Sequence, residues 1–157
     1  MMGRRPIGPE NAPVAENAPV SILLVDDDDG DAKGVVRAFR KARISNPIFR
    51  AVDGMQALEK LRSADRPFSR DAVILLVDIN MPRMNGHEFV RELRKDVQLR
   101  KLIVFMLTTS DDRTDLDAAF DNNVAGYILK QNAGRDFMQL TETLDTYWRL
   151  VELPVTT

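Results

Sequence analysis

The chain of 157 residues contains no cysteine and only one histidine. The lack of cysteine excludes disulfides, thiolate metal sites and cysteine nucleophiles, and it favours a reducing compartment such as the cytoplasm. No stretch comes near the roughly 18 consecutive apolar residues that a membrane-spanning helix needs. The first twenty residues carry two arginines with no apolar run behind them, which does not fit a secretory signal. We therefore expect a cytoplasmic protein without a membrane segment.

An excess of positive charge is also missing. The 22 lysines and arginines are outnumbered by 24 aspartates and glutamates, which gives a formal net charge of −2. A chain with this balance has no basic field to hold a phosphate backbone. We therefore expect no binding to nucleic acid by this chain alone.

The two ends of the chain differ in composition from the middle. Residues 1–19 hold four of the eight prolines, and the near-repeat ENAPVAENAPV begins there, which is typical of a disordered or extended arm. We expect one domain over residues 20–150, followed by a short arm, VELPVTT, at 151–157. This β-rich arm has two interpretations that the sequence does not separate, a strand that pairs with a neighbouring chain and a frayed terminus.

Short aliphatic runs alternate with amphipathic stretches in the middle of the chain. The runs are SILLV at 21–25, PIFRAV at 47–52, AVILLVD at 72–78, LIVFML at 102–107 and AGYILK at 125–130. Near-continuous apolar runs of this length are typical of parallel strands that are buried on both faces. Apolar residues recur at helical spacing within 32–42, 57–61, 89–93, 116–120 and 137–148. The pattern predicts an α/β domain of the (βα)5 type, with a doubly wound, five-stranded parallel sheet and right-handed crossovers.

Polar side chains follow four of the five predicted strands. Residues 26–29 are aspartates after the first strand, Asp78 ends the third, Thr108 and Thr109 follow the fourth, and Lys130 ends the fifth. Ligands of such sheets bind at the carboxyl ends of the strands, beside the point where the strand order reverses. Carboxylates that meet there repel one another unless a cation lies among them, and oxygen ligands suit Mg²⁺. The sequence therefore predicts a magnesium site at this edge of the sheet.

Helix capping offers a second explanation of the aspartates, because Asp is favoured at a helix N-terminus. We assign that role to Asp28, Asp29 and Asp31. Asp26 and Asp27 lie closest to the apolar run, and we expect their side chains to point into the cleft.

Asp78 follows six apolar residues, where an unpaired carboxylate would be costly, so a functional role is favoured. A carboxylate close to Mg²⁺ can act as a nucleophile toward phosphorus. The hydroxyl of Thr108 and the ammonium of Lys130 are suited to bind the phosphoryl oxygens, although each alone would be an ordinary strand-end residue.

The segments VDD at 25–27, VDINMPRMNG at 77–86, LTTS at 107–110 and GYILK at 126–130 have the order and spacing of a known family. Together they resemble the receiver domain of two-component response regulators, which has the flavodoxin-like fold, over about residues 20–150. The resemblance implies that a sensor histidine kinase transfers a phosphoryl group from its phosphohistidine to an aspartate of this chain, and that hydrolysis later removes it. Such a domain is a signalling phosphoacceptor, not an enzyme that acts on other substrates.

The resemblance also implies the composition of the metal site. Asp78 is the implied phosphoacceptor. Mg²⁺ is implied to bind Asp27, Asp78 and the backbone carbonyl of Asn80 directly, and Asp26 through water.

A second group of residues is implied to bind the phosphoryl group and to transmit its presence. Thr108 is the switch hydroxyl, Lys130 is the ion-pairing partner, and Pro82 and Gly86 shape the loop after the acceptor. Tyr127 is the aromatic that turns inward, and a half-buried strand tyrosine with a wet hydroxyl is an equally compatible interpretation.

One position departs from the family pattern. Receivers usually have a proline after this lysine, in a cis peptide, whereas here Gln131 follows Lys130. We expect a trans bond, since a cis bond before a non-proline residue costs about 2.5–4 kcal/mol. His87, just past the loop glycine, is expected to be an exposed residue in the first turn of the third helix.

The proline-rich arm and the segment YWRLVELP at 147–154 are similar to stand-alone response regulators that work with bacterial phytochromes. Only nine residues follow Trp148, so we expect no output domain. The signal is then expected to leave through a partner or a homodimer. The dimer is expected to form through the C-terminal arm or through the surface of the fourth helix, fifth strand and fifth helix.

Two other functions stay open at this point. The segment DDDG at 27–30 fits the opening motif of aspartyl phosphatases of the haloacid dehalogenase type, with Asp27 as nucleophile and Asp29 as acid/base. Asp31 stands where these enzymes have threonine or valine, which counts against them. The third function is an adaptor with a receiver fold that works without phosphorylation.

Overall fold

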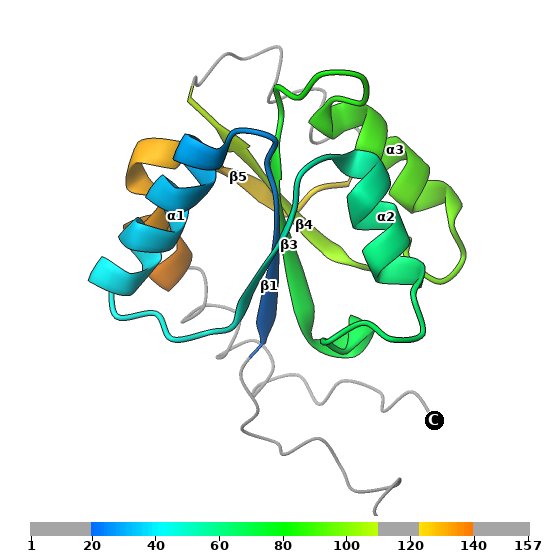
Figure 1. Ribbon diagram of the computed structural model, residues 1–157, viewed down its shortest axis with the longest axis horizontal. Helices are drawn as coiled ribbons and strands as arrows, with labels where there is room; N and C mark the ends of the chain where they lie inside the picture. The colour runs from blue at the N-terminus through cyan, green and yellow to red at the C-terminus, as the bar shows by residue number, and fades with distance from the viewer. Residues whose placement is uncertain (1–19, 110–122, 140–157) are drawn as a thin grey trace, which may run out of the picture.

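A computed structural model describes residues 20–109 and 123–139 of the chain (Figure 1). In this part, five parallel strands form one sheet in the order β2-β1-β3-β4-β5. The strands are β1 (Ser21–Val25), β2 (Ile48–Ala51), β3 (Val73–Asp78), β4 (Ile103–Thr108) and β5 (Gly126–Leu129). Each lies within one of the five predicted apolar runs or extends it by one residue, so the predicted sheet is confirmed.

Helices connect the strands and cover both faces of the sheet. They are α1 (Asp29–Lys41), α2 (Gly54–Arg62) and α3 (Gly86–Lys95), with short 3-10 turns η2 (Arg70–Ala72) and η3 (Lys130–Asn132). Residues 133–139 are helical and follow η3 directly. Figure 1 shows α1 and the 133–139 helix on one face, and α2 and α3 on the other.

The core has two layers because successive strand residues point to opposite faces of a sheet. In β1, Leu23 and Val25 pack under α2 and α3, whereas Ile22 and Leu24 pack under α1 and the 133–139 helix. All six residues of β3 are buried, which explains why the central strand reads as one apolar run.

Polar residues cap the starts of α1, α2 and α3. The side chain of Asp28 accepts a hydrogen bond from the backbone of Asp31 and caps α1, and Asp53 caps α2 in the same way. Asn85 and Glu88 form a reciprocal capping box at the start of α3. The capping role predicted for Asp28 is therefore confirmed.

Two local predictions have different outcomes. The peptide between Lys130 and Gln131 is trans, as expected, since the described residues contain no cis bond. His87 lies in the first turn of α3 as predicted, but the expectation that it is exposed is wrong. Its side chain is half-buried, and both ring nitrogens are shielded from water.

Several predicted segments lie outside the described residues. They are the two arms at 1–19 and 151–157, the helix predicted within 116–120, and the helix predicted within 137–148 beyond residue 139. No helix in the described part is long and apolar enough to span a membrane.

Candidate functional site

The strand order reverses between β1 and β3, and this geometry brings three carboxylates together. Val25 and Val77 are register partners, so the residues that follow them, Asp26 and Asp78, end side by side. Asp26, Asp27 and Asp78 each place a carboxylate oxygen within 4.8 Å of the others. Asp26 and Asp78 are buried, whereas Asp27 is exposed. We call these three residues the acidic cluster, and their predicted convergence is confirmed.

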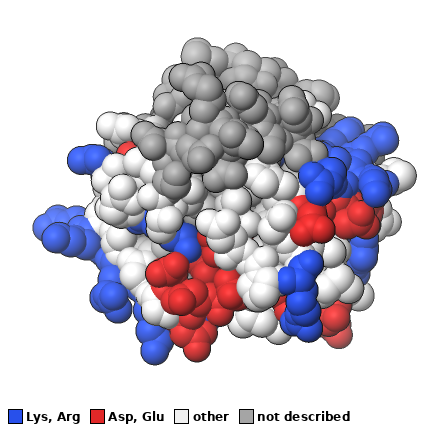
Figure 2. Space-filling view, turned by 90° about the horizontal axis from the view of Figure 1, so that it is seen from above, with Lys and Arg blue, Asp and Glu red and all other residues white. Residues whose placement is uncertain are grey.

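The acidic cluster lies at the carboxyl end of the sheet. Figure 2 looks onto this end and shows a large patch of acidic side chains with lysine and arginine side chains beside it, and further acidic side chains apart from this patch. The position agrees with the general rule that open parallel sheets bind ligands beside their switch point.

Asp78 has an unusual affinity for protons. Burial and the neighbouring charge of Asp26 raise the pKa of Asp78 to about 6, although the Lys130 ammonium and the backbone N–H of Asn80 oppose this effect. The Asn80 N–H lies 3.3 Å from Oδ1 of Asp78. One lysine therefore does not neutralise the cluster, and a further cation would be stabilised there.

Asp26 supports the same conclusion. Its Oδ1 accepts a hydrogen bond from the backbone N–H of Asp28 at 3.0 Å. Its Oδ2 is buried and accepts no well-aligned hydrogen bond from the described residues, and Nζ of Lys130 lies 3.1 Å away as a charge contact. A buried carboxylate oxygen with this spare capacity fits an oxygen-preferring divalent cation.

Lys130 connects β5 to the acidic cluster. Its Nζ lies 3.3 Å from Oδ1 of Asp78 and 2.8 Å from Oδ2 of Asp31, and its side chain is 11% exposed. Burial disfavours the charged form, but contacts with Asp31, Asp78 and Asp26 outweigh it and raise the pKa of Lys130. The ammonium is therefore firmly charged.

The sequence did not predict the contact between Asp31 and Lys130. We assigned Asp31 only to the start of α1, where it does lie, but its carboxylate also binds Lys130. Capping explained every local feature of Asp31, so nothing near it in the sequence pointed to a residue 99 positions away.

Arg50 is the second residue that the sequence analysis missed. From β2 its guanidinium donates two hydrogen bonds to the backbone carbonyl of Asp26, at 2.8 and 3.2 Å, and one to Oδ1 of Asp29 at 2.6 Å. It thereby ties the loop of the acidic cluster to the edge of the sheet. An arginine within the apolar run PIFRAV, next to a strand that ends in aspartates, was the signal.

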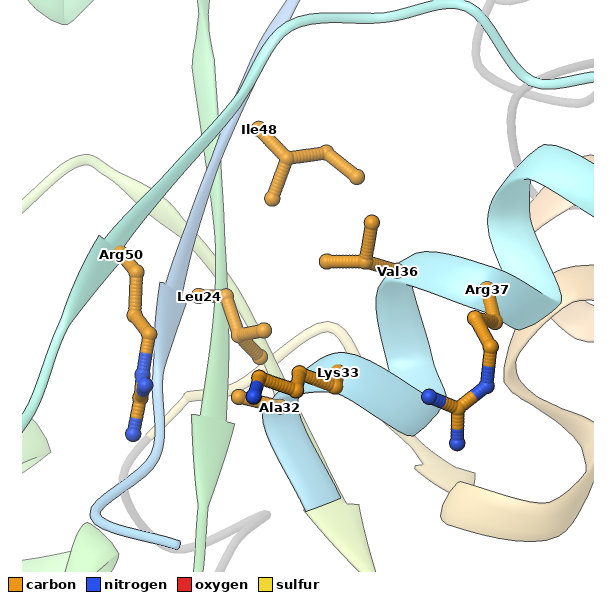
Figure 3. A pocket seen from close by; sticks show the side chains of 7 residues that line it. All are labelled: Leu24, Ala32, Lys33, Val36, Arg37, Ile48 and Arg50. Atoms are coloured by element: carbon orange, nitrogen blue, oxygen red, sulfur yellow. The ribbon is translucent and has the colours of Figure 1, made fainter. Parts of the chain in front are cut away.

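Beside Arg50 lies a hollow of about 320 Å³ between the sheet and α1 (Figure 3). Its walls combine four apolar and three cationic side chains, Leu24, Ala32, Val36, Ile48, Lys33, Arg37 and Arg50. The acidic cluster contributes no side chain to it, so the hollow and the carboxylate site are separate features.

The remaining predicted residues lie on β4, β5 and the loop after β3. Thr108 ends β4 and is 1% exposed, one residue beyond Leu107, the register partner of Asp78. Tyr127, on β5, is half-buried and packs against the core layer of α2 and α3. Asn80 is exposed.

The loop after β3 folds back toward Asp78. The backbone N–H of Gly86 donates to the carbonyl of Ile79 at 2.9 Å. A side-chain carbon at Gly86 would lie 2.6 Å from the backbone oxygen of Asp78, so only glycine fits there.

Comparison with known protein families identifies the arrangement. The model of the response regulator receiver domain matches residues 22–142. The chain belongs to this family. Receiver domains are phosphoacceptors of two-component systems, and the acidic cluster of this receiver fits such a phosphorylation site.

Named relatives of this receiver are regulators. It is 32% identical to the probable methanogenesis regulatory protein FilR2 of Methanothrix harundinacea, over 83% of this chain and 84% of that one. It is 27% identical to the response regulator Rcp1 of Synechocystis, over 88% and 95%. Among solved structures, the bacteriophytochrome response regulator AtBRR is 28% identical, over 83% and 95%, with a TM-score of 0.70. Rcp1 in its Mn²⁺-bound form is 25% identical, over 88% and 98%, with a TM-score of 0.61.

The phosphatase alternative does not fit this receiver. It requires Asp29 to work beside Asp27, but Asp29 lies outside the acidic cluster. Its side chain is 78% exposed and its carboxylate is held by Arg50. The family and this placement both favour a phosphoacceptor.

Proposed function

We propose that this receiver takes a phosphoryl group from a sensor histidine kinase onto Asp78, with Mg²⁺ bound at the acidic cluster. The observation that carries the proposal is that Asp78 belongs to the acidic cluster and also lies 3.3 Å from the Lys130 ammonium. The phosphoacceptor therefore has carboxylate neighbours suited to a metal and a fixed positive charge in contact with it.

The reaction is a phosphoryl transfer between two side chains. A carboxylate oxygen of Asp78 forms the new bond to phosphorus as the P–N bond of the kinase's phosphohistidine breaks, and the imidazole leaves. Lys130 and the hydroxyl of Thr108 bind the phosphoryl oxygens, and Tyr127 responds to the movement of Thr108. The domain thus promotes its own phosphorylation. It also promotes its own dephosphorylation, in which water attacks phosphorus, the bond to the Asp78 oxygen breaks, and the carboxylate and inorganic phosphate are released.

The described residues fit a hard divalent cation. Asp26, Asp27 and Asp78 supply oxygens, and the backbone carbonyl of Asn80 is the further ligand that we propose. When bound, the cation offsets the negative charge that gathers on the phosphoryl oxygens. Mn²⁺ in the related Rcp1 structure supports a divalent ion, and Mg²⁺ is our proposal for this chain.

Treatment of the full chain with acetyl phosphate and Mg²⁺ tests the proposal. Intact mass and peptide mapping are expected to show one phosphoryl group on Asp78, lost in Asp78→Asn and retained in Asp65→Asn, which removes an exposed aspartate elsewhere. Chelation of the metal is expected to abolish labelling. Label on Asp27 would favour a phosphatase, and no label at all would favour an adaptor that works without phosphorylation.

The partner that we propose is a cytoplasmic histidine kinase of the phytochrome type. The similarity to AtBRR, a bacteriophytochrome response regulator, supports it. Phosphorylation in vitro by a phytochrome kinase, compared with an unrelated kinase at equal concentration, tests this partner. A homodimer through the C-terminal arm, or through the surface of the fourth helix, β5 and the last helix, stays a prediction that solution mass with and without residues 151–157 would check.

A further inference from the structure

Lys130 holds more carboxylates than the proposed phosphoryl transfer requires. An ammonium has three N–H groups. Three carboxylates surround this one, with Nζ at 2.8 Å from Asp31, 3.1 Å from Asp26 and 3.3 Å from Asp78. A phosphoryl oxygen that binds Lys130 must therefore displace one of these contacts.

Asp31 differs from the other two carboxylates in position and surroundings. Asp26 and Asp78 belong to the acidic cluster, and their side chains are 0% and 6% exposed. Asp31 lies on the first turn of α1, is 47% exposed and is not a member of the cluster. Removing its charge leaves the three metal-site carboxylates in place.

These differences decide which contact gives way. Asp26 is a buried carboxylate that would bear the full cost of desolvation if it lost its partner, and Asp78 carries the phosphoryl group itself, whereas the half-exposed Asp31 regains water. Asp31 is therefore the contact that Lys130 exchanges for a phosphoryl oxygen. Asp31 also binds the same ammonium that the incoming phosphoryl group must bind. Its negative charge therefore favours the unphosphorylated state.

We propose that Asp31 is a positioning residue that competes with the phosphoryl group for Lys130, and so sets how tightly the site holds that group. The inference rests on the proposed function, because it assigns Lys130 to the phosphoryl oxygens. It adds a fourth carboxylate that acts through the lysine, without contact with metal or phosphorus.

The neighbouring residue Asp29 offers a matched control. It also lies on the first turn of α1, and it also binds a cation, Arg50, at 2.6 Å. Asp29→Asn therefore removes the same charge from the same helix end, and it leaves Lys130 and the two hydrogen bonds from Arg50 to the Asp26 carbonyl in place. Asp31→Glu keeps the charge and tests for rescue.

The first measurement is the dissociation constant of beryllium trifluoride, a phosphoryl analogue, with the full chain and Mg²⁺, by titration calorimetry. Asp31→Asn is expected to bind about two- to fivefold more tightly than the unsubstituted protein, the scale of a half-exposed ion pair. Asp29→Asn and Asp31→Glu are expected to bind like the unsubstituted protein. Unchanged or weaker binding by Asp31→Asn, or an equal gain in Asp29→Asn, would overturn the inference and leave the proposed function standing.

The second measurement needs neither metal nor analogue. The ¹⁵N ammonium signal of Lys130, assigned by its absence from Lys130→Arg, is expected to be sharp in the unsubstituted protein. It is expected to broaden in Asp31→Asn and to stay sharp in Asp29→Asn and Asp31→Glu. A sharp signal in Asp31→Asn would overturn the inference. Failure of the unsubstituted protein to bind beryllium trifluoride would overturn the proposed function, and the inference with it.

Discussion

Nζ of Lys130 lies 3.3 Å from Oδ1 of Asp78, although β3, which ends at Asp78, and β5, which Lys130 follows, are not neighbours in the sheet. β4 lies between them, so the lysine side chain reaches past the end of β4, where Thr108 stands. A lysine suits this task because its charge sits on a long apolar stem. The arrangement gathers an acceptor, a hydroxyl and a cation from three adjacent strand ends.

Replacing Lys130 by methionine is expected to destabilise the metal-free protein. The carboxylates of Asp26, Asp31 and Asp78 would lose their shared partner, and breaking a buried ion pair from one side costs about 3–5 kcal/mol. Urea unfolding at pH 8 measures the loss, which Mg²⁺ is expected to reduce. Lys101→Met, at an exposed lysine, is the control. Equal losses in the two variants would show that the contacts with the carboxylates contribute nothing to folding.

The stability of the metal-free protein is expected to depend on pH through Asp78. Its pKa is about 6 in the folded chain against an ordinary value of 3.8, so the folded state binds this proton more tightly than the unfolded state. The resulting stabilisation is complete below pH 3.8 and is lost as the pH rises through 6. Asp78→Asn is therefore expected to be more stable than its parent at pH 7.5, by roughly 1–3 kcal/mol.

Thermal unfolding of both proteins between pH 4 and 8, without metal, checks this difference. The gain from Asp78→Asn is expected to shrink toward pH 4 and when Mg²⁺ is added. Stability profiles that stay parallel across this range would contradict the raised pKa.

The fold was predictable from the sequence because its central strands are buried on both faces. AVILLVD differs from the polar segments around it for that reason, and the observed strand Val73–Asp78 lies inside this run. PIFRAV holds the half-buried edge strand Ile48–Ala51, which still reads as a mainly apolar run. The acidic cluster followed from the same pattern, since the ends of parallel strands share one edge of the sheet.

The second layer of contacts was not predictable in this way. Asp31 had a sufficient local explanation in helix capping, and the apolar run around Arg50 indicated a strand without indicating what the arginine binds. Two contacts depend on the direction that long side chains take after folding. They are the contact of Lys130 with Asp31 and that of Arg50 with the carbonyl of Asp26. Strand and helix periodicity specify the face of an element on which a residue lies. They do not specify where the charged group of a long lysine or arginine side chain comes to lie.

Arg50 is expected to support the metal site through the backbone of Asp26. Arg50→Met removes two hydrogen bonds to that carbonyl, which Asp29→Asn retains. Partners that orient metal ligands often account for 10–100-fold in affinity, and because this side chain is 28% exposed we expect about 3- to 10-fold weaker Mg²⁺ binding. Titration calorimetry with Mg²⁺ measures it.

Arg37→Met is the control for Arg50, because Arg37 borders the same hollow and lies on α1 (Figure 3). It has no hydrogen bond to the loop of the acidic cluster among the described contacts. An equal loss of Mg²⁺ affinity in both variants would mean that general positive charge matters, not the contact with Asp26.

Gly86 is expected to be essential to the loop after Asp78, whereas Gly34 is not. A side-chain carbon at Gly86 would lie 2.6 Å from the Asp78 carbonyl oxygen and 2.9 Å from Cα of Ile79, both backbone atoms of the site. Gly86→Ala must therefore move the acceptor strand, at a cost of about 1–3 kcal/mol, and is expected to slow labelling by acetyl phosphate.

Gly34→Ala has the opposite expected effect. The nearest atom to an added carbon there is 4.0 Å away, on the flexible side chain of Arg37, and alanine in a helix is favoured over glycine by about 0.5–1 kcal/mol. Urea unfolding and acetyl phosphate labelling of both variants separate the two positions. Gly86→Ala could unfold at a lower urea concentration than its parent and still be labelled at the parent rate. That result would mean that the loop shifts away from Asp78 without moving the carboxylate, because only a displaced acceptor slows the transfer.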